Sequence, residues 1–194
     1  MLKLKISMNN KQYIIFDLDG TLVDSRATVA GACKRVFAKL APDAMPDNNY
    51  FLSFRLTDFE RQFSEMAEMA GMSVADFRTN YDEQYALDCV SGTKPIKQQY
   101  DILRKAKELG VGTIVLTNKL QSVAEQVCNT FFKKDEIDII IGREDANPIK
   151  PRQILIDKLC AYGVIPSKQC LMYYGDSESD RMSADLLCVP YIEV

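Results

Sequence analysis

Eight residues of types that can bind a cation or handle a phosphate group lie in four short stretches of the chain. They are four carboxylates, a hydroxyl, an amide, a glycine and a lysine: Asp17, Asp19, Gly20, Thr117, Asn118, Lys150, Asp176 and Asp180. Carboxylate oxygens are ligands that suit Mg²⁺. A hydroxyl with neighbouring backbone N–H groups can hold phosphate oxygens, and a lysine can offset the negative charge of phosphoryl transfer. These residue types therefore point to Mg²⁺-dependent chemistry on a phosphate group.

Each stretch taken alone has a simpler structural interpretation. The pair Asp19-Gly20 could form a hairpin turn, and the Thr117 hydroxyl could cap a following helix. Lys150 could be a solvated loop residue, and Asp176 could interact with a helix dipole. Because all four stretches occur together, each near the end of a predicted strand or the start of a predicted helix, we favour the functional interpretation.

Short apolar runs rich in Ile, Val and Tyr precede these polar residues. Continuous runs of this kind are typical of strands buried on both faces of a parallel sheet. Stretches with a helical pattern lie between the later runs. The predicted strands are Tyr13–Phe16, Gly112–Leu116, Ile137–Ile141, Cys170–Tyr174 and 189–194, and the predicted helices are Tyr100–Leu109, Ser122–Phe131 and Pro151–Tyr162. This alternation predicts an α/β fold with a Rossmann-like, doubly wound and mostly parallel sheet.

The segment 26–92 interrupts the alternation of strands and helices. It contains three helical stretches and no clear strand: Ala27–Leu40, Thr57–Ala70 and Val74–Cys89. Thr57 and Ser73 are suitable helix N-caps. We therefore predict an α/β core formed by residues 1–25 and 93–194, with an all-helical cap inserted at residues 26–92.

The predicted sheet would bring the polar residues together. Ligands of open α/β sheets bind outside the carboxyl ends of the strands, where Asp17, Thr117 and Asp176 are expected. Four carboxylates crowded at one edge would repel one another unless a cation lay among them. An all-oxygen site of this kind suits Mg²⁺.

Composition excludes several classes of protein. The 194 residues carry a formal net charge of -3 with no basic block, so neither nucleic acid nor a membrane is expected as a partner. There is no histidine, and the six cysteines are scattered, which disfavours zinc. The N-terminal stretch 1–10 has no continuous apolar run like that of a signal peptide. We therefore expect a soluble, cytoplasmic protein with free thiols.

The four stretches resemble the signature motifs of the haloacid dehalogenase-like superfamily. The segment 17–25 (DLDGTLVDS) matches the first motif, 117–119 (TNK) the second, 150–151 (KP) the third and 175–180 (GDSESD) the fourth. A helical insertion directly after the first motif is similar to the C1-capped branch. The combination of motifs is most similar to phosphoglycolate phosphatase-like members.

The resemblance implies a role for each site residue. Asp17 would be the nucleophile that forms an aspartyl-phosphate, and Asp19 the general acid and base. The phosphoryl group would be held by Gly20, Thr117, Asn118 and Lys150, with Lys150 also acting in catalysis. Mg²⁺ would bind Asp17, Asp176 and the backbone carbonyl of Asp19, and Asp180 would be a further ligand or a residue that anchors the ligands. Because members that cleave carbon–halogen bonds lack an acid at the position of Asp19, phosphoryl transfer is favoured.

Three functions remain open at this stage. The first is a phosphatase that acts on a small phosphorylated metabolite, as a monomer or a homodimer. The second is a phosphomutase of the beta-phosphoglucomutase type, which would use the same chemistry on Asp17. The third is a non-catalytic phospho-acceptor or binding protein, although the chain retains Asp17, Asp19, Lys150 and Asp176. In the cap, Arg55 and Arg61 are expected to be solvated.

Overall fold

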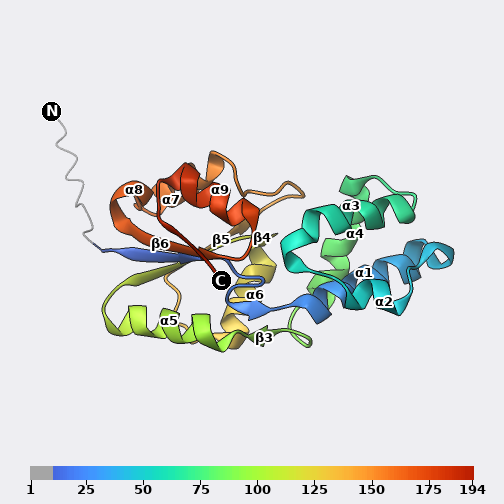
Figure 1. Ribbon diagram of the computed structural model, residues 1–194, viewed down its shortest axis with the longest axis horizontal. Coiled ribbons are helices and arrows are strands. Elements are labelled where there is room, and N and C mark those ends of the chain that lie inside the picture. The colour runs from blue at the N-terminus through green and yellow to red at the C-terminus, as the bar shows by residue number, and fades with distance from the viewer. Residues whose placement is uncertain (1–10) are drawn as a thin grey trace.

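The computed structural model describes residues 11–194, which form a parallel five-stranded sheet with helices on both faces (Figure 1). The strand order is β5-β4-β1-β6-β7, and all four pairings are parallel. The strands are β1 (Tyr13–Phe16), β4 (Gly112–Leu120), β5 (Ile139–Arg143), β6 (Cys170–Gly175) and β7 (Tyr191–Glu193). The predicted α/β fold with a Rossmann-like sheet is therefore confirmed.

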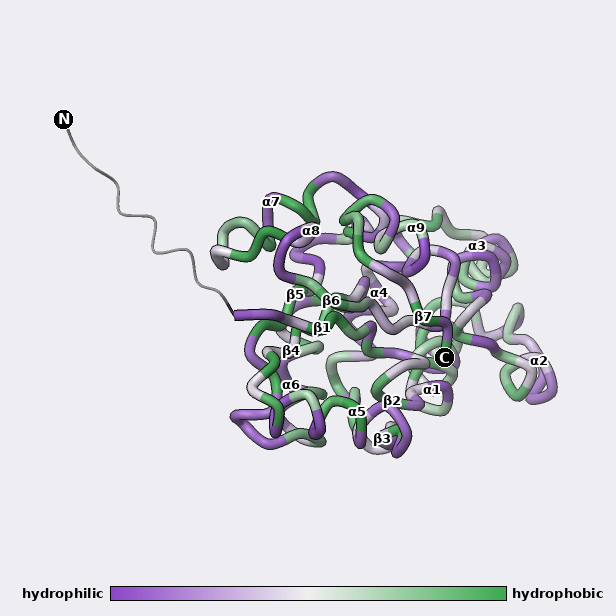
Figure 2. Tube along the Cα trace, turned by 60° about the vertical axis from the view of Figure 1, so that its left-hand side comes forward, coloured by the Kyte–Doolittle hydropathy of each residue, from purple (hydrophilic) through white to green (hydrophobic). Residues whose placement is uncertain are grey.

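Alternate side chains of the central strands enter two separate hydrophobic cores, because successive residues of a strand point to opposite faces. Phe16 and Val115 pack with the helices on one face, whereas Ile15 and Ile114 pack with the helices on the other. The first face carries α5 (Lys97–Glu108) and α6 (Gln121–Phe131), and the second carries α7 (Ile154–Ala161), α8 (Pro166–Gln169) and α9 (Glu178–Leu187). In Figure 2 hydrophobic segments occur on the central strands and also on the helices around them, where they alternate with hydrophilic ones.

A helical insertion, defined here as α1 to α4, lies beyond one end of the sheet (Figure 1). Its elements are α1 (Arg26–Leu40), α2 (Asn48–Leu52), α3 (Phe59–Met69) and α4 (Val74–Leu87), with short 3-10 helices at Pro42–Ala44 (η1) and Leu56–Asp58 (η2). Buried aromatic rings hold it together; Phe63, for example, packs edge-on against Phe77 with ring centroids 5.0 Å apart. The predicted boundaries between core and cap stay a prediction.

A two-stranded antiparallel ribbon joins the insertion to the core. It is formed by β2 (Val23–Asp24) and β3 (Lys94–Pro95), which pair across the two connections. Strands of two residues are too short to show an alternating pattern. These two strands therefore leave no recognisable pattern in the sequence.

Two predicted helix starts are wrong. Thr57 is not an N-cap, because it lies inside η2 and α3 begins only at Phe59. The helix expected from Pro151 begins at Ile154, after a turn in which the Arg152 N–H donates to the Ile149 carbonyl. The N-cap prediction for Ser73 is confirmed, since its side chain accepts a hydrogen bond from the Asp76 N–H at 3.1 Å.

The cysteines agree with the expectation of free thiols. All six cysteines lie within the described residues and are free. Among the helices of residues 11–194, none is long and apolar enough to cross a bilayer. The expectation that the N-terminal stretch is not a signal peptide concerns residues 1–10, which lie outside the described residues.

Candidate active site

The sheet topology brings the predicted site residues to one edge. Asp17 follows the last residue of the central strand β1, and Asp176 follows the last residue of its neighbour β6. On the other side, Thr117 lies within the C-terminal part of β4. Because β4, β1 and β6 are adjacent and parallel, their carboxyl ends meet below the helical insertion, around a cavity of about 370 Å³.

Three carboxylates form a compact cluster at this edge. Asp17, Asp176 and Asp180 each offer one oxygen, and these oxygens lie within 4.8 Å of one another. Asp17 is 4% exposed and Asp180 is fully buried. Their oxygens form a donor set that a hard divalent cation prefers, and such an ion would relieve the repulsion between them. The residues therefore fit a metal site.

Glycines allow two of these carboxylates to approach the backbone closely. Gly20 has a φ of +90°, and a Cβ placed on it would lie 1.9 Å from Oδ2 of Asp176. A Cβ on Gly175 would lie 2.4 Å from Cβ of Asp180. The predicted contact of Gly20 with phosphate stays a prediction, whereas its contact with Asp176 was not foreseen.

Asp180 is oriented by the start of α9. Its carboxylate accepts hydrogen bonds from the Ser177 backbone N–H at 3.2 Å and from the Ser177 hydroxyl at 2.5 Å, completing a capping box. The hydroxyl of Tyr173 donates to its other oxygen at 3.0 Å. These bonds hold Asp180 in one orientation toward the cluster.

Lys150 bridges two members of the cluster. Its Nζ lies 2.5 Å from Oδ1 of Asp17 and 2.6 Å from Oδ1 of Asp180. The loop that carries it is tied to β4, because the backbone N–H groups of Ile149 and Lys150 donate to Oδ1 of Asn118 at 2.9 and 2.8 Å. Asn118 thus has a structural contact of its own, and its predicted contact with phosphate stays a prediction.

The electrostatics of the cluster follow from burial and from charge pairing. Burial, reinforced by the charges of Asp180, Asp176 and Asp19, raises the pKa of Asp17 well above its ordinary value despite Lys150. Burial and the charge of Asp180 raise the pKa of Asp176 to about 6. Burial opposes ionisation of Asp180 as well, but Lys150 and the hydrogen bonds from Ser177 and Tyr173 outweigh it and lower its pKa.

The pKa of Lys150 depends on the same two effects, burial and charge pairing. Burial alone would lower its pKa, yet the carboxylates of Asp17 and Asp180 raise it well above the usual value for lysine. The lysine is therefore held as a cation between the two acids. A group of this kind can balance the charge of a bound anion.

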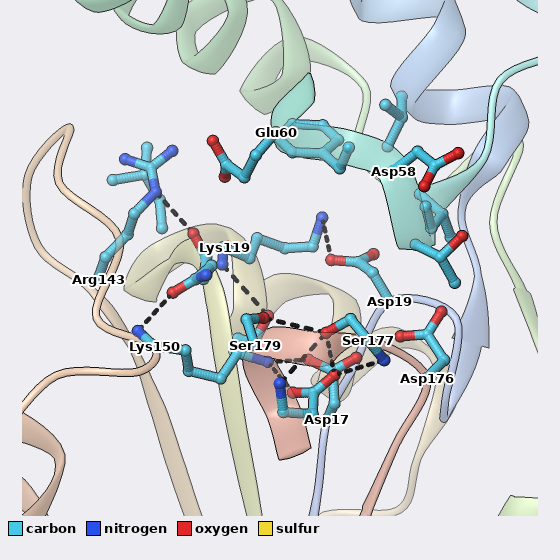
Figure 3. Close-up of a pocket in the computed structure, with 18 of the residues that line it drawn as sticks. Asp17, Asp19, Asp58, Glu60, Lys119, Arg143, Lys150, Asp176, Ser177 and Ser179 are labelled. Carbon is cyan, nitrogen blue, oxygen red and sulfur yellow. Dashed lines mark hydrogen bonds and ion pairs between the residues drawn. The ribbon is translucent and has the colours of Figure 1, made fainter. Parts of the chain in front are cut away.

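Asp19 lies apart from the cluster, as Figure 3 shows. Its Oδ2 is 3.0 Å from Nζ of Lys119, and its Oδ1 accepts a hydrogen bond from the Ser25 hydroxyl at 2.5 Å. Burial alone would lower the pKa of Lys119, but Asp19 and Tyr85 raise it above the ordinary value. Thr117 lies close by, and its hydroxyl accepts a hydrogen bond from the Lys119 N–H at 3.2 Å.

The helical insertion forms the opposite wall of the cavity. Apolar and aromatic side chains alternate there with charged ones: Leu56, Asp58, Phe59, Glu60, Arg61, Arg78, Tyr81, Asp82 and Tyr85. Arg61 pairs with Glu65 at 2.6 Å and its side chain is 62% exposed, so it is solvated as expected. Glu60 and Asp58 lie above the cluster in Figure 3.

The sequence patterns assign no role to Lys119 or Arg143, which are among the buried cations of the cavity. Lys119 lies in the motif 117–119, in which only Thr117 and Asn118 were given a role, and Arg143 belongs to none of the motifs. The Arg143 guanidinium donates to the Asn118 carbonyl at 2.7 Å and pairs with Asp82 of α4. Arg143 therefore links the core to the insertion. No local pattern indicates this link, because Asn118 and Asp82 are distant from Arg143 in the chain.

Comparisons with known proteins agree with this arrangement. A phosphoglycolate phosphatase from Aquifex aeolicus is 28% identical over 171 residues, covering 86% of this chain and 76% of that protein. A candidate pyrophosphatase, PpaX, from Caldanaerobacter subterraneus is 26% identical over 177 residues, covering 88% and 76%. These proteins are similar to the chain along most of its length.

Solved structures share the fold. A phosphatase predicted in Clostridium acetobutylicum superposes with a TM-score of 0.76 at 20% identity, covering 94% of this chain and 84% of that one. A haloacid dehalogenase-like protein from Streptococcus pneumoniae gives 0.72 at 22% identity, covering 96% and 85%. The sequence profile of the haloacid dehalogenase-like hydrolases matches residues 14–194. The chain therefore belongs to the haloacid dehalogenase-like hydrolase family.

Proposed function

We propose that the chain is a Mg²⁺-dependent phosphatase that hydrolyses a small phosphate monoester through an aspartyl-phosphate on Asp17. The observation that carries this proposal is the position of Asp17 at the end of β1, bound to Lys150 at 2.5 Å and clustered with Asp176 and Asp180. The similarity to phosphoglycolate phosphatases supports the same substrate class. The partner would be a small phosphorylated metabolite, and the free thiols favour the cytoplasm.

In the first half of the reaction, a carboxylate oxygen of Asp17 forms a bond to phosphorus as the bond to the leaving oxygen breaks. Asp19 donates a proton to that leaving oxygen, so that the product leaves as an alcohol. Lys150 balances the negative charge next to the nucleophile. Thr117, which lines the cavity, would donate a hydrogen bond from its hydroxyl to a phosphoryl oxygen.

In the second half, Asp19 takes the proton back from a water molecule. The water oxygen bonds to phosphorus while the bond to Asp17 breaks, and inorganic phosphate is released. Asp17, Asp176 and Asp180 would hold the Mg²⁺ ion, together with the backbone carbonyl of Asp19. When bound, the ion would neutralise charge on the phosphoryl group and on the acids. The helical insertion would act as a cap that limits access of water.

The test is phosphate release from 4-nitrophenyl phosphate and a panel of phosphorylated metabolites, with Mg²⁺ and with EDTA. Asp17→Asn removes the nucleophile, and Asp101→Asn, in an exposed ion pair with Lys97, is the matched control. We expect turnover that requires Mg²⁺, is lost in Asp17→Asn and persists in Asp101→Asn. Undiminished turnover in Asp17→Asn would contradict the mechanism, and no release from any compound would contradict the function.

A further inference from the structure

Lys119 carries a buried charge that the reaction described above does not use. Its side chain is only 7% exposed, and its Nζ lies 3.0 Å from Oδ2 of Asp19, whose side chain is 22% exposed. Burying an ammonium group is unfavourable unless a carboxylate is paired with it. The contact between Lys119 and Asp19 is therefore required by the position of the lysine and is not a chance surface pair.

The two buried lysines of the site serve different carboxylates. Lys150 pairs with Asp17 at 2.5 Å and with Asp180 at 2.6 Å. Within residues 11–194, the only ion pair of Lys119 is the one with Asp19. One lysine thus balances the nucleophile and the carboxylate cluster, and the other forms its ion pair with the group that exchanges protons.

Both oxygens of Asp19 are held. Oδ2 faces Lys119, and Oδ1 accepts a hydrogen bond of 2.5 Å from the hydroxyl of Ser25, which is fully buried. These two contacts restrict χ1 and χ2 of the Asp19 side chain. Because each carboxylate oxygen has two acceptor positions, Asp19 can still exchange a proton with a third group.

The helical insertion holds Lys119 from the other side. The Nζ of Lys119 lies 3.9 Å from the ring centroid of Tyr85, a residue of α4 that is 2% exposed. A cation at this distance from an aromatic face is attracted to it. The ammonium group is therefore fixed between Asp19 of the core and Tyr85 of the insertion, and Figure 3 shows it directed at Asp19.

We propose that Lys119 is a positioning residue that, together with Ser25, orients the Asp19 carboxylate for proton transfer, and that Tyr85 couples this orientation to the docked insertion. The inference rests on the proposed function, because it assumes that Asp19 exchanges the proton. Proton transfer depends on the position of the acid relative to the leaving oxygen. Loss of Lys119 should therefore impair esters whose leaving oxygen needs a proton more than esters whose leaving group departs as a stable anion.

The experiment compares Lys119→Met with the wild type on two esters of similar size, phenyl phosphate and 4-nitrophenyl phosphate. The measured quantity is kcat/KM, which reports the transfer of the phosphoryl group to Asp17. We expect kcat/KM for phenyl phosphate to fall about 10- to 100-fold and that for 4-nitrophenyl phosphate to fall less than about threefold. Lys119→Arg keeps the positive charge. Its ratio of kcat/KM for phenyl phosphate to kcat/KM for 4-nitrophenyl phosphate should therefore be close to the wild-type ratio.

Lys97→Met is the matched control, because Lys97 forms an exposed ion pair with Asp101. It should leave both esters unchanged. Ser25→Ala, which removes the other attachment of Asp19, should shift the ratio in the same direction and serves as the test if Lys119→Met does not fold. An equal loss for both esters would overturn the proposal, since a purely structural lysine would act in that way. A wild-type protein that hydrolyses neither ester would instead refute the proposed function, and this inference with it.

Discussion

Replacing Gly20 with alanine should damage the metal site while leaving the fold intact. The added Cβ would lie 1.9 Å from Oδ2 of Asp176, whereas real contacts of this kind are essentially never shorter than 3.0 Å. Asp176 must therefore retreat by at least about 1 Å, a displacement that can cost about 100-fold in rate at an active site. The φ of +90° adds a backbone cost of about 1–2 kcal/mol.

Gly163→Ala separates these two effects. Gly163 has a φ of +75°, and a Cβ on it would meet nothing within 4 Å. Both variants should lose about 1–2 kcal/mol of unfolding free energy, because both place alanine at positive φ. Only Gly20→Ala should also lose activity and need more Mg²⁺, because only there does the new atom displace a carboxylate.

The assay is phosphate release titrated with MgCl₂ for the three proteins, together with urea denaturation. We expect about a 100-fold lower kcat/KM and a higher Mg²⁺ midpoint in Gly20→Ala, and wild-type values for both in Gly163→Ala. If Gly20→Ala retained wild-type activity and Mg²⁺ dependence, the close packing of Gly20 on Asp176 would not matter for the site, and the reasoning would be refuted.

Three further predictions concern metal binding and stability. Mg²⁺ at about 100 times its Kd should raise the Tm by roughly 5–10 °C, measured by differential scanning fluorimetry. Asp176→Asn should reduce this shift, whereas the control Asp157→Asn, at an exposed position, should not. Arg143→Met should lower the unfolding free energy by about 2–3 kcal/mol, because it leaves Asp82 and the Asn118 carbonyl unpaired, whereas exposed Arg152→Met should change it little in urea denaturation. Burial would raise the pKa of Asp138, but hydrogen bonds from Lys11, the Thr113 N–H and Lys107 outweigh it and lower that pKa. The ionised Asp138 therefore stabilises the folded state above its unfolded-state pKa of about 3.9. This stabilisation is lost as the pH falls through the folded-state pKa. Asp138→Asn should accordingly lower the unfolding free energy by about 1 kcal/mol at pH 7. The difference from the wild type should shrink below about pH 4. An equal difference at pH 7 and below about pH 4 would count against this explanation.

Local sequence patterns were enough to predict the main strands and the polar residues that follow them. Runs such as Tyr13–Phe16 are apolar on both faces, and that pattern alone predicts a strand of a covered parallel sheet. The polar residues that follow, Asp17 and Asp176, then had to lie at the carboxyl ends of strands, whatever the strand order. Local spacing carries this information because it depends only on neighbours along the chain.

How these residues pair with one another depends on contacts that form only in the folded chain. The adjacency of β4 to β1, with the hydrogen bonds that tie the Lys150 loop to Asn118 of β4, places Lys150 beside Asp17, 133 residues away. Likewise, no local pattern marks Lys119 as the partner of Asp19 or Arg143 as the partner of Asp82. Such pairs form because burying a charge requires an opposite charge nearby, and only the packed chain decides which one is within reach.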